Sequence, residues 1–144
     1  EIYRKRLAGY KEALMVNCRS YDDTLVVSSN LMKFNGAEIM ENLLKQHPDI
    51  DGVFSANDEA AVGALKFLKS IGKNVPGDVA VVGFSNDPLS EVVDPALTTV
   101  EQFGAEIGRK ACSLLIENIR NFEKGNRQPQ TIIITPKLIE RESS

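Results

Sequence analysis

The feature that most constrains this sequence is a βαβ pattern between residues 51 and 84. An apolar strand is predicted at residues 52–55 and a second at 79–84, with a polar turn and a helix at 58–71 between them. A crossover long enough for a helix places two such strands parallel in one sheet. Open sheets of this kind bind ligands at the carboxyl ends of their strands. The polar turn therefore lies where a small polar molecule would be held.

The rest of the chain continues this alternation of helices and strands. Helical spacing of apolar residues predicts helices at 4–15, 35–46 and 103–124, the last of them ended by Gly125. Short apolar runs predict strands at 24–28, 131–135 and 137–141, and a short extended segment at 98–101. We therefore expect an α/β fold, a parallel sheet with helices on both faces. The helix at 103–124 has no strand directly before it, and the pattern alone would pack it on the same sheet.

The polar turn itself indicates what kind of ligand to expect. It lacks the glycine spacing of a phosphate-binding loop, which argues against a nucleotide. The side chains of Asn57 and Asp58 would then hold the ligand. Asp58 is equally suited to cap the amino end of the helix, and Asn57 could serve only to shape the turn.

Charge and composition exclude several functions. The formal net charge is −3 and no basic face is visible, so we expect no direct contact with DNA. One histidine and two distant cysteines give no metal site and no cofactor site, and no set of catalytic residues stands out, so an enzyme is not expected. No apolar run has the length of a membrane span.

Several short motifs, in a fixed order, point to one family. They are Arg6-Leu7-Ala8-Gly9-Tyr10, Asn57-Asp58 with Ala61 and Gly63, Val75-Pro76, Val82-Gly83-Phe84, Leu97-Thr98-Thr99-Val100 with Gln102, and Pro136-Lys137-Leu138-Ile139-Glu140-Arg141-Glu142-Ser143. Each motif is weak by itself, but the order and spacing are specific and span nearly the whole chain. The sequence resembles the LacI/GalR transcriptional repressors, whose effector domain is built like the periplasmic sugar-binding proteins.

The resemblance implies a particular division of the chain. Effector domains of this family have two similar lobes, and the chain crosses between them three times. Residues 1–102 would then form most of the second lobe, residues 103–126 a helix of the first lobe, and residues 127–144 strands that return to the second lobe. The DNA-binding headpiece and most of the first lobe would lie outside these residues.

The same resemblance assigns effector-binding roles to Arg6, Asn57 and Ser85. An arginine fork suits hydroxyls or a carboxylate, although an exposed surface role for Arg6 is the alternative. Many family members carry an aspartate where Ser85 stands, directly after the aromatic residue of the strand. Without the negative charge of that aspartate, the site would tolerate an acidic effector, such as a uronate or a phosphorylated sugar. We expect Arg6, Asn57 and Ser85 to converge at the carboxyl edge of the sheet.

Two further residues are effector candidates by resemblance. Phe34 could supply the aromatic ring that stacks on the ligand, with a place in the core as the alternative. Gln102 lies at a predicted crossing between lobes, where it could sense ligand and hinge together or serve only as a hinge.

The resemblance also implies a homodimer. We expect the helix at 58–71 and the loop at 87–95 to pack against their copies across a two-fold axis. The predicted contact residues are Ala61, Ala64, Leu65, Leu68, Leu89 and Val92.

The leading interpretation is the effector-binding and dimerisation portion of a cytoplasmic, sugar-responsive LacI/GalR-type regulator. Its effector would be a small molecule, a sugar or sugar acid, and operator DNA would bind only through a headpiece. A periplasmic sugar-binding protein of a transport system is the alternative with the same fold. An α/β enzyme is a third interpretation, disfavoured by the missing phosphate loop and catalytic groups.

Overall fold

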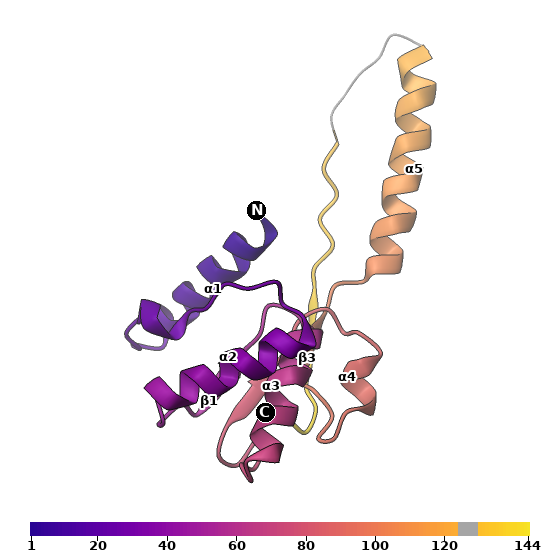
Figure 1. Cartoon of the computed structure of the whole chain (residues 1–144). Helices are drawn as coiled ribbons and strands as arrows, with labels where there is room; N and C mark the ends of the chain where they lie inside the picture. The colour runs from indigo at the N-terminus through magenta and orange to yellow at the C-terminus, as the bar shows by residue number, and fades with distance from the viewer. Residues whose placement is uncertain (124–129) are drawn as a thin grey trace.

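The computed structural model describes residues 1–123 and 130–144, and it contains helices and short strands in alternation (Figure 1). The helices are α1 (Ile2–Val16), the 3-10 turn η1 (Asp23–Leu25), α2 (Lys33–Gln46), α3 (Asp58–Ser70), α4 (Leu89–Val92) and α5 (Gly104–Glu123). The strands are β1 (Gly52–Phe54), β2 (Ala80–Val82), β3 (Thr99–Glu101) and β4 (Lys137–Ile139).

The predicted parallel sheet is confirmed. β1 pairs with β2 in parallel, with Val53 opposite Val81. Parallel bridges from Val82 to Thr98 and from Ser85 to Glu101 extend the pairing toward β3. β4 runs antiparallel to β3, so the last strand differs in direction from the others.

The core lies where α3 packs against α2 and β2. Its buried members come from these elements and from the flanking loops: Met40, Ala61, Val62, Ala64, Leu68, Val79, Val81 and Leu97. α2 and α3 approach closely because Gly36 and Gly63 face the partner helix. A Cβ at Gly36 would clash with the carbonyl of Ala60, and one at Gly63 with the carbonyl of Lys33. This contact fixes the amino end of α3, where the polar turn sits.

Two predicted strands are wrong. Residues 24–28 begin in η1, because Asp22 Oδ1 accepts hydrogen bonds from the Thr24 N–H at 2.9 Å and the Thr24 hydroxyl at 2.7 Å. That local turn captures the backbone before it can pair with a neighbouring strand. Residues 131–135 form no strand either, and Ile133 is 85% exposed. The strand predicted at 52–55 exists, but β1 is largely exposed in this chain and not buried.

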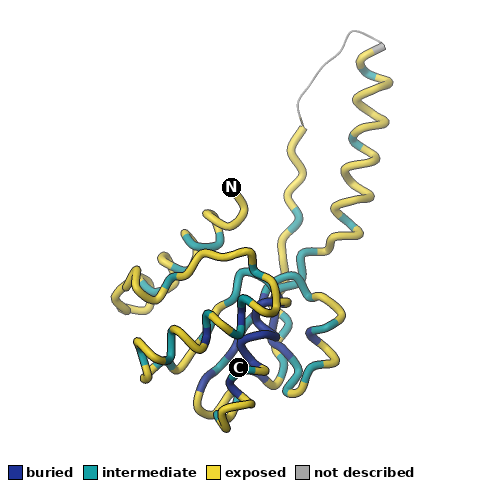
Figure 2. Tube along the Cα trace, viewed as in Figure 1, coloured by how far each residue is buried: buried dark blue, intermediate teal, exposed yellow. Residues whose placement is uncertain are grey.

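α5 projects away from the body of the molecule, and the segment that leads into β4 returns beside it (Figure 1). Figure 2 shows that the helix is exposed along almost its whole length. Its large apolar residues include Ile107, Leu115, Ile116, Ile119 and Phe122, all partly or largely exposed. The expectation that this helix packs on the sheet is therefore wrong. The predicted helix end at Lys124 and Gly125, and the domain boundaries at 126 and 127, lie outside the described residues.

In the part of the chain that is described, no helix is both long and apolar enough to cross a bilayer.

Candidate functional site

Arg6 lies at the centre of the candidate site. α1 carries its guanidinium over the ring of Phe84, with the Cζ atom 3.8 Å from the ring centroid. Phe84 follows β2 and is itself packed edge-on against Phe54 of β1, with ring centroids 6.5 Å apart. Arg6 Nη1 donates a hydrogen bond to the carbonyl of Ala56 in the polar turn. The arginine is therefore held by the ends of the two parallel strands.

Gln102 connects Arg6 to Ser85. Its Oε1 accepts a hydrogen bond from Arg6 Nη2 at 3.1 Å, and its Nε2 donates to Ser85 Oγ at 3.1 Å. Ala56 comes after β1, Ser85 after β2 and Gln102 after β3, so the carboxyl ends of three strands meet at one guanidinium. Parallel strands produce this convergence because their carboxyl ends lie at the same edge. The structure thus brings together three of the predicted site residues.

The backbone of Ser85 is unusual. It adopts φ 133°, and Asn86 follows with φ 51°, in a region that side-chain-bearing residues rarely occupy. Such conformations cluster at functional sites because the surrounding structure must hold them in place. Here the Ser85 N–H donates to the Val100 carbonyl at 3.0 Å, which ties the turn to β3.

Partial burial sets the electrostatics of Arg6. Desolvation lowers the pKa of its guanidinium from the ordinary value, while nearby Tyr3 acts in the opposite direction. The group stays charged, since arginine is not deprotonated in proteins. Its stacking on Phe84 is a cation–π contact of the kind that strengthens when water is excluded.

Asn57 lies beside this cluster and performs a structural task. It caps α3, because its Oδ1 accepts the Ala60 N–H at 3.0 Å, and its Nδ2 donates to the Leu31 carbonyl at 2.9 Å. The cap is thus Asn57, and the prediction that Asp58 caps this helix is wrong. A role for Asn57 in ligand contact stays a prediction.

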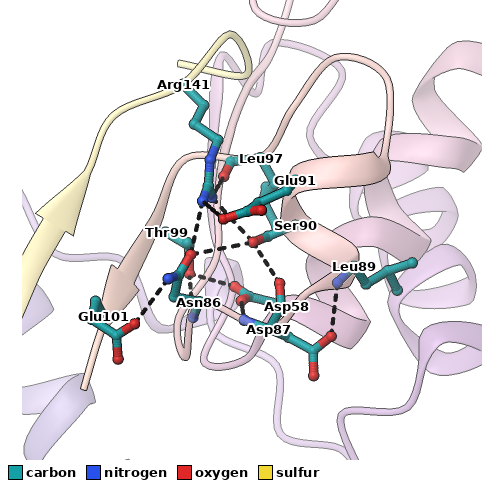
Figure 3. A network of polar contacts seen from close by, with 10 residues as sticks. All are labelled: Asp58, Asn86, Asp87, Leu89, Ser90, Glu91, Leu97, Thr99, Glu101 and Arg141. Atoms are coloured by element: carbon teal, nitrogen blue, oxygen red, sulfur yellow. Dashed lines mark hydrogen bonds and ion pairs between the residues drawn. The ribbon is translucent and has the colours of Figure 1, made fainter. Parts of the chain in front are cut away.

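Asp58 is buried, with 1% exposure, and serves the loop that follows β2. Its Oδ2 accepts the Asp87 N–H at 2.7 Å and its Oδ1 accepts the Thr99 hydroxyl at 2.6 Å (Figure 3). Both oxygens are used inside the protein, so the predicted effector contact by Asp58 does not fit this structure.

A polar network around Arg141 was not anticipated from the sequence (Figure 3). Arg141 donates to Asn86 Oδ1 at 2.9 Å, to Ser90 Oγ at 3.1 Å and to the Leu97 carbonyl at 2.8 Å, and it pairs with Glu91 at 3.0 Å. Asn86 in turn donates to Glu101 Oε2 at 2.9 Å. The network fixes the residues that flank Ser85 and Gln102. In the sequence, Arg141 belongs to the terminal motif that supports the family resemblance. The spacing of that motif does not predict which residues Arg141 contacts.

The whole chain, residues 1–144, matches the family described as periplasmic binding protein-like domain. The chain belongs to this family. It is 36% identical to the HTH-type transcriptional regulator CelR of Thermobifida fusca over 139 residues, which are 96% of this chain and 40% of that protein. It is 37% identical to the ribose operon repressor of Halalkalibacterium halodurans, again over 96% of this chain and 40% of that protein.

This periplasmic binding protein-like domain is also similar in structure to a solved transcriptional regulator. The complex of transcriptional regulator CelR with cellobiose superimposes with a TM-score of 0.88 at 35% identity, over 96% of this chain and 42% of that one. These relatives are named as transcriptional regulators or repressors, as the sequence resemblance indicated. The domain spans about 40% of the length of the curated relatives it matches.

Most of the predicted dimer residues of the domain are not at its surface. Ala61, Leu65 and Leu68 have 0% exposure and Ala64 has 4%, because α3 is covered by α2 and the sheet. Placing them at an interface with a second copy is therefore wrong. Leu89 is half-buried and Val92 is 78% exposed, so Val92 is the one predicted dimer residue with a largely accessible side chain.

Phe34, the predicted stacking residue, lies on α2 with 76% exposure, so the alternative of a core position is wrong. Its contact with a ligand stays a prediction. Among the residues that the structure describes, no group of three histidine, cysteine or acidic side chains could hold a metal ion.

Proposed function

We propose that this domain is the effector-binding and dimerisation portion of a cytoplasmic, sugar-responsive LacI/GalR-type transcriptional regulator. Ligand binding would alter the affinity of the whole protein for operator DNA. The observation that carries the proposal is the meeting of Arg6, Gln102 and Ser85 at the carboxyl edge of the sheet. The solved relative that binds cellobiose supports a carbohydrate effector for the same fold.

A transport protein is the second candidate because it shares the fold. The relatives named above are transcriptional regulators, which favours regulation over transport. Operator DNA would be bound by a headpiece outside residues 1–144, since the formal net charge of −3 gives this domain no electrostatic attraction for a phosphate backbone.

α5 supports a two-lobed arrangement of the whole protein. Its apolar residues, such as Ile107 and Ile119, are 47% and 53% exposed, and a helix with such a stripe is stabilised by covering it. We place residues 1–102 in one lobe, α5 in the other, and the terminal segment back in the first of these. Arg6 and Gln102 would then lie at the boundary between lobes. Closure of one lobe on a ligand would change the contacts of both residues.

A thermal-shift screen of the intact protein against sugars tests the proposal. A binding sugar should raise the melting temperature, because a ligand that binds only the native state stabilises it. Arg6→Ala should abolish the shift, whereas Lys5→Ala, an exposed change on the same turn of α1, should leave it intact. A shift that survives Arg6→Ala would contradict the assignment of this site.

A further inference from the structure

At the candidate site, the side-chain acceptors have hydrogen-bond partners within the protein, whereas several side-chain donors do not. The side-chain acceptors already receive protein donors: Gln102 Oε1 from Arg6, Ser85 Oγ from Gln102, and Asn57 Oδ1 from the Ala60 N–H. Several donors have no such commitment. Arg6 has N–H groups beyond the two that bind Ala56 and Gln102, and one N–H of Asn57 is left beyond the bond to Leu31. The hydroxyl proton of Ser85 is likewise available while its oxygen accepts from Gln102.

The charge of Arg6 is also uncompensated within residues 1–123 and 130–144. The ion pairs there are Arg4–Glu1, Lys45–Glu41, Lys69–Asp94 and Arg141–Glu91, and none involves Arg6. Asp58 and Glu101, which are close in sequence to the Arg6 partners Ala56 and Gln102, hold other protein donors. Asp58 accepts from Asp87 and Thr99, and Glu101 accepts from Asn86 and Phe103. A carboxylate or phosphate that reaches this unpaired guanidinium would gain charge-assisted hydrogen bonds from its remaining N–H groups.

The unused donors and the unpaired charge of Arg6 together favour one class of ligand. A neutral sugar hydroxyl both donates and accepts, so a site that offers acceptors as well as donors suits it best. A carboxylate or phosphate accepts only, which matches a cation surrounded by uncommitted donors. We propose that the effector is an anionic carbohydrate, a sugar acid or sugar phosphate, whose negative group binds Arg6 and the Ser85 hydroxyl. This inference rests on the proposed effector-binding function and specifies its ligand class.

The test compares matched neutral and acidic sugars by isothermal titration calorimetry of the intact protein. The pairs are glucose with glucuronate, cellobiose with cellobionate, and glucose with glucose 6-phosphate, so that the carboxylate and phosphate arms are separate. We expect the acidic member of at least one pair to bind at least about tenfold more tightly than its neutral partner. That preference should weaken as NaCl is raised, as expected for a charge pair that is screened.

Variants assign the preference to Arg6. Arg6→Gln should bring the ratio of acidic to neutral affinity close to one, and Arg6→Lys should retain part of it, since lysine keeps the charge but loses the fork. Lys5→Gln removes one charge from the same exposed turn and should leave the ratio unchanged. The ratio is the readout because partial unfolding lowers both affinities alike.

The outcomes separate the two proposals. A neutral sugar that binds as tightly as its acidic partner would overturn the anionic assignment and still support an effector-binding domain. Binding of no member of the three pairs would count against both. An acidic preference that is unchanged in Arg6→Gln would overturn the role of Arg6 in this inference.

Discussion

Arg141 donates a hydrogen bond from Nη2 to Asn86 Oδ1 over 2.9 Å, so the C-terminal segment is fixed to the turn that follows β2. Ser85, the neighbour of Asn86, is the residue that contacts Gln102 at the candidate site. The side chain of Arg141 is only 14% exposed, so its hydrogen bonds are largely shielded from water. The geometry of the site therefore depends on a residue far away in the sequence.

Arg141→Lys should weaken both the fold and the site. A lysine ammonium cannot reach Asn86, Ser90 and Leu97 together, so part-buried acceptors lose their donor. We expect unfolding free energy to fall by about 1–3 kcal/mol, the cost of leaving such groups unsatisfied. Urea denaturation measures this, with Arg109→Lys on exposed α5 as the control. Equal stability of the two variants would show that the network contributes little.

Asp58→Asn is a nearly isosteric change with a large expected effect. The carboxylate accepts from two donors, the Asp87 N–H and the Thr99 hydroxyl, and an amide NH₂ would face one of them. We expect a loss of about 2 kcal/mol or more in unfolding free energy, because a buried donor would be left without an acceptor. Glu59→Gln, an exposed change at the next position of α3, should alter stability little. Comparable losses in both variants would argue against a special role for Asp58.

Asp58 also illustrates what the sequence can and cannot predict. The βαβ unit follows from local patterns, since apolar runs and helical spacing determine which residues are buried. Which of two adjacent polar residues caps α3 depends on where the loop after β2 lies, because that loop supplies the partners of Asp58. The prediction of Leu65 as a dimer contact fails for a similar reason. A helix pattern does not say how many neighbours cover it, and α3 is covered by α2 through Gly36 and Gly63 as well as by the sheet.

The remaining differences have one non-local and one local cause. The cluster of Arg6, Gln102 and Ser85 could be expected, because the carboxyl ends of parallel strands meet at one edge. The Arg141 network joins segments that are far apart in the sequence, and no local pattern of residues predicts such contacts. The strand expected at residues 24–28 has the right apolar residues, but the Asp22 side chain forms a turn with Thr24 instead.

Asn86→Ala should change the titration of Glu101. The Asn86 amide holds the pKa of the Glu101 carboxyl below its usual range, with the Phe103 N–H as a second donor. A depressed pKa means that this contribution to stability is present above the ordinary pKa of about 4.5 and is lost as pH falls through the folded value. Carbon-detected NMR titration should show the pKa of Glu101 moving up in Asn86→Ala. It should not move in Asn118→Ala on exposed α5, and an unchanged value in both would contradict the assignment.

Val92 offers the sharpest test of self-association. It is 78% exposed on α4, beside a groove lined by Lys66, Lys69, Leu89, Val93 and Asp94. Burying such a valine in an interface contributes on the order of 2 kcal/mol, so Val92→Asp should weaken a dimer that uses it by at least about tenfold. Sedimentation of the intact protein over a concentration series measures this change.

The control for Val92 is Val16→Asp, a similarly exposed valine on α1 with 72% exposure. A dimer that is unaffected by Val92→Asp, or weakened equally by Val16→Asp, would place the interface elsewhere. Leu65 is unsuitable for the same experiment, although it lies on the helix first expected to dimerise. Its exposure is 0%, so a charge there would have to be buried in the core of one subunit. Any loss of dimer in such a variant would report unfolding of the subunit and not the loss of a contact between two copies.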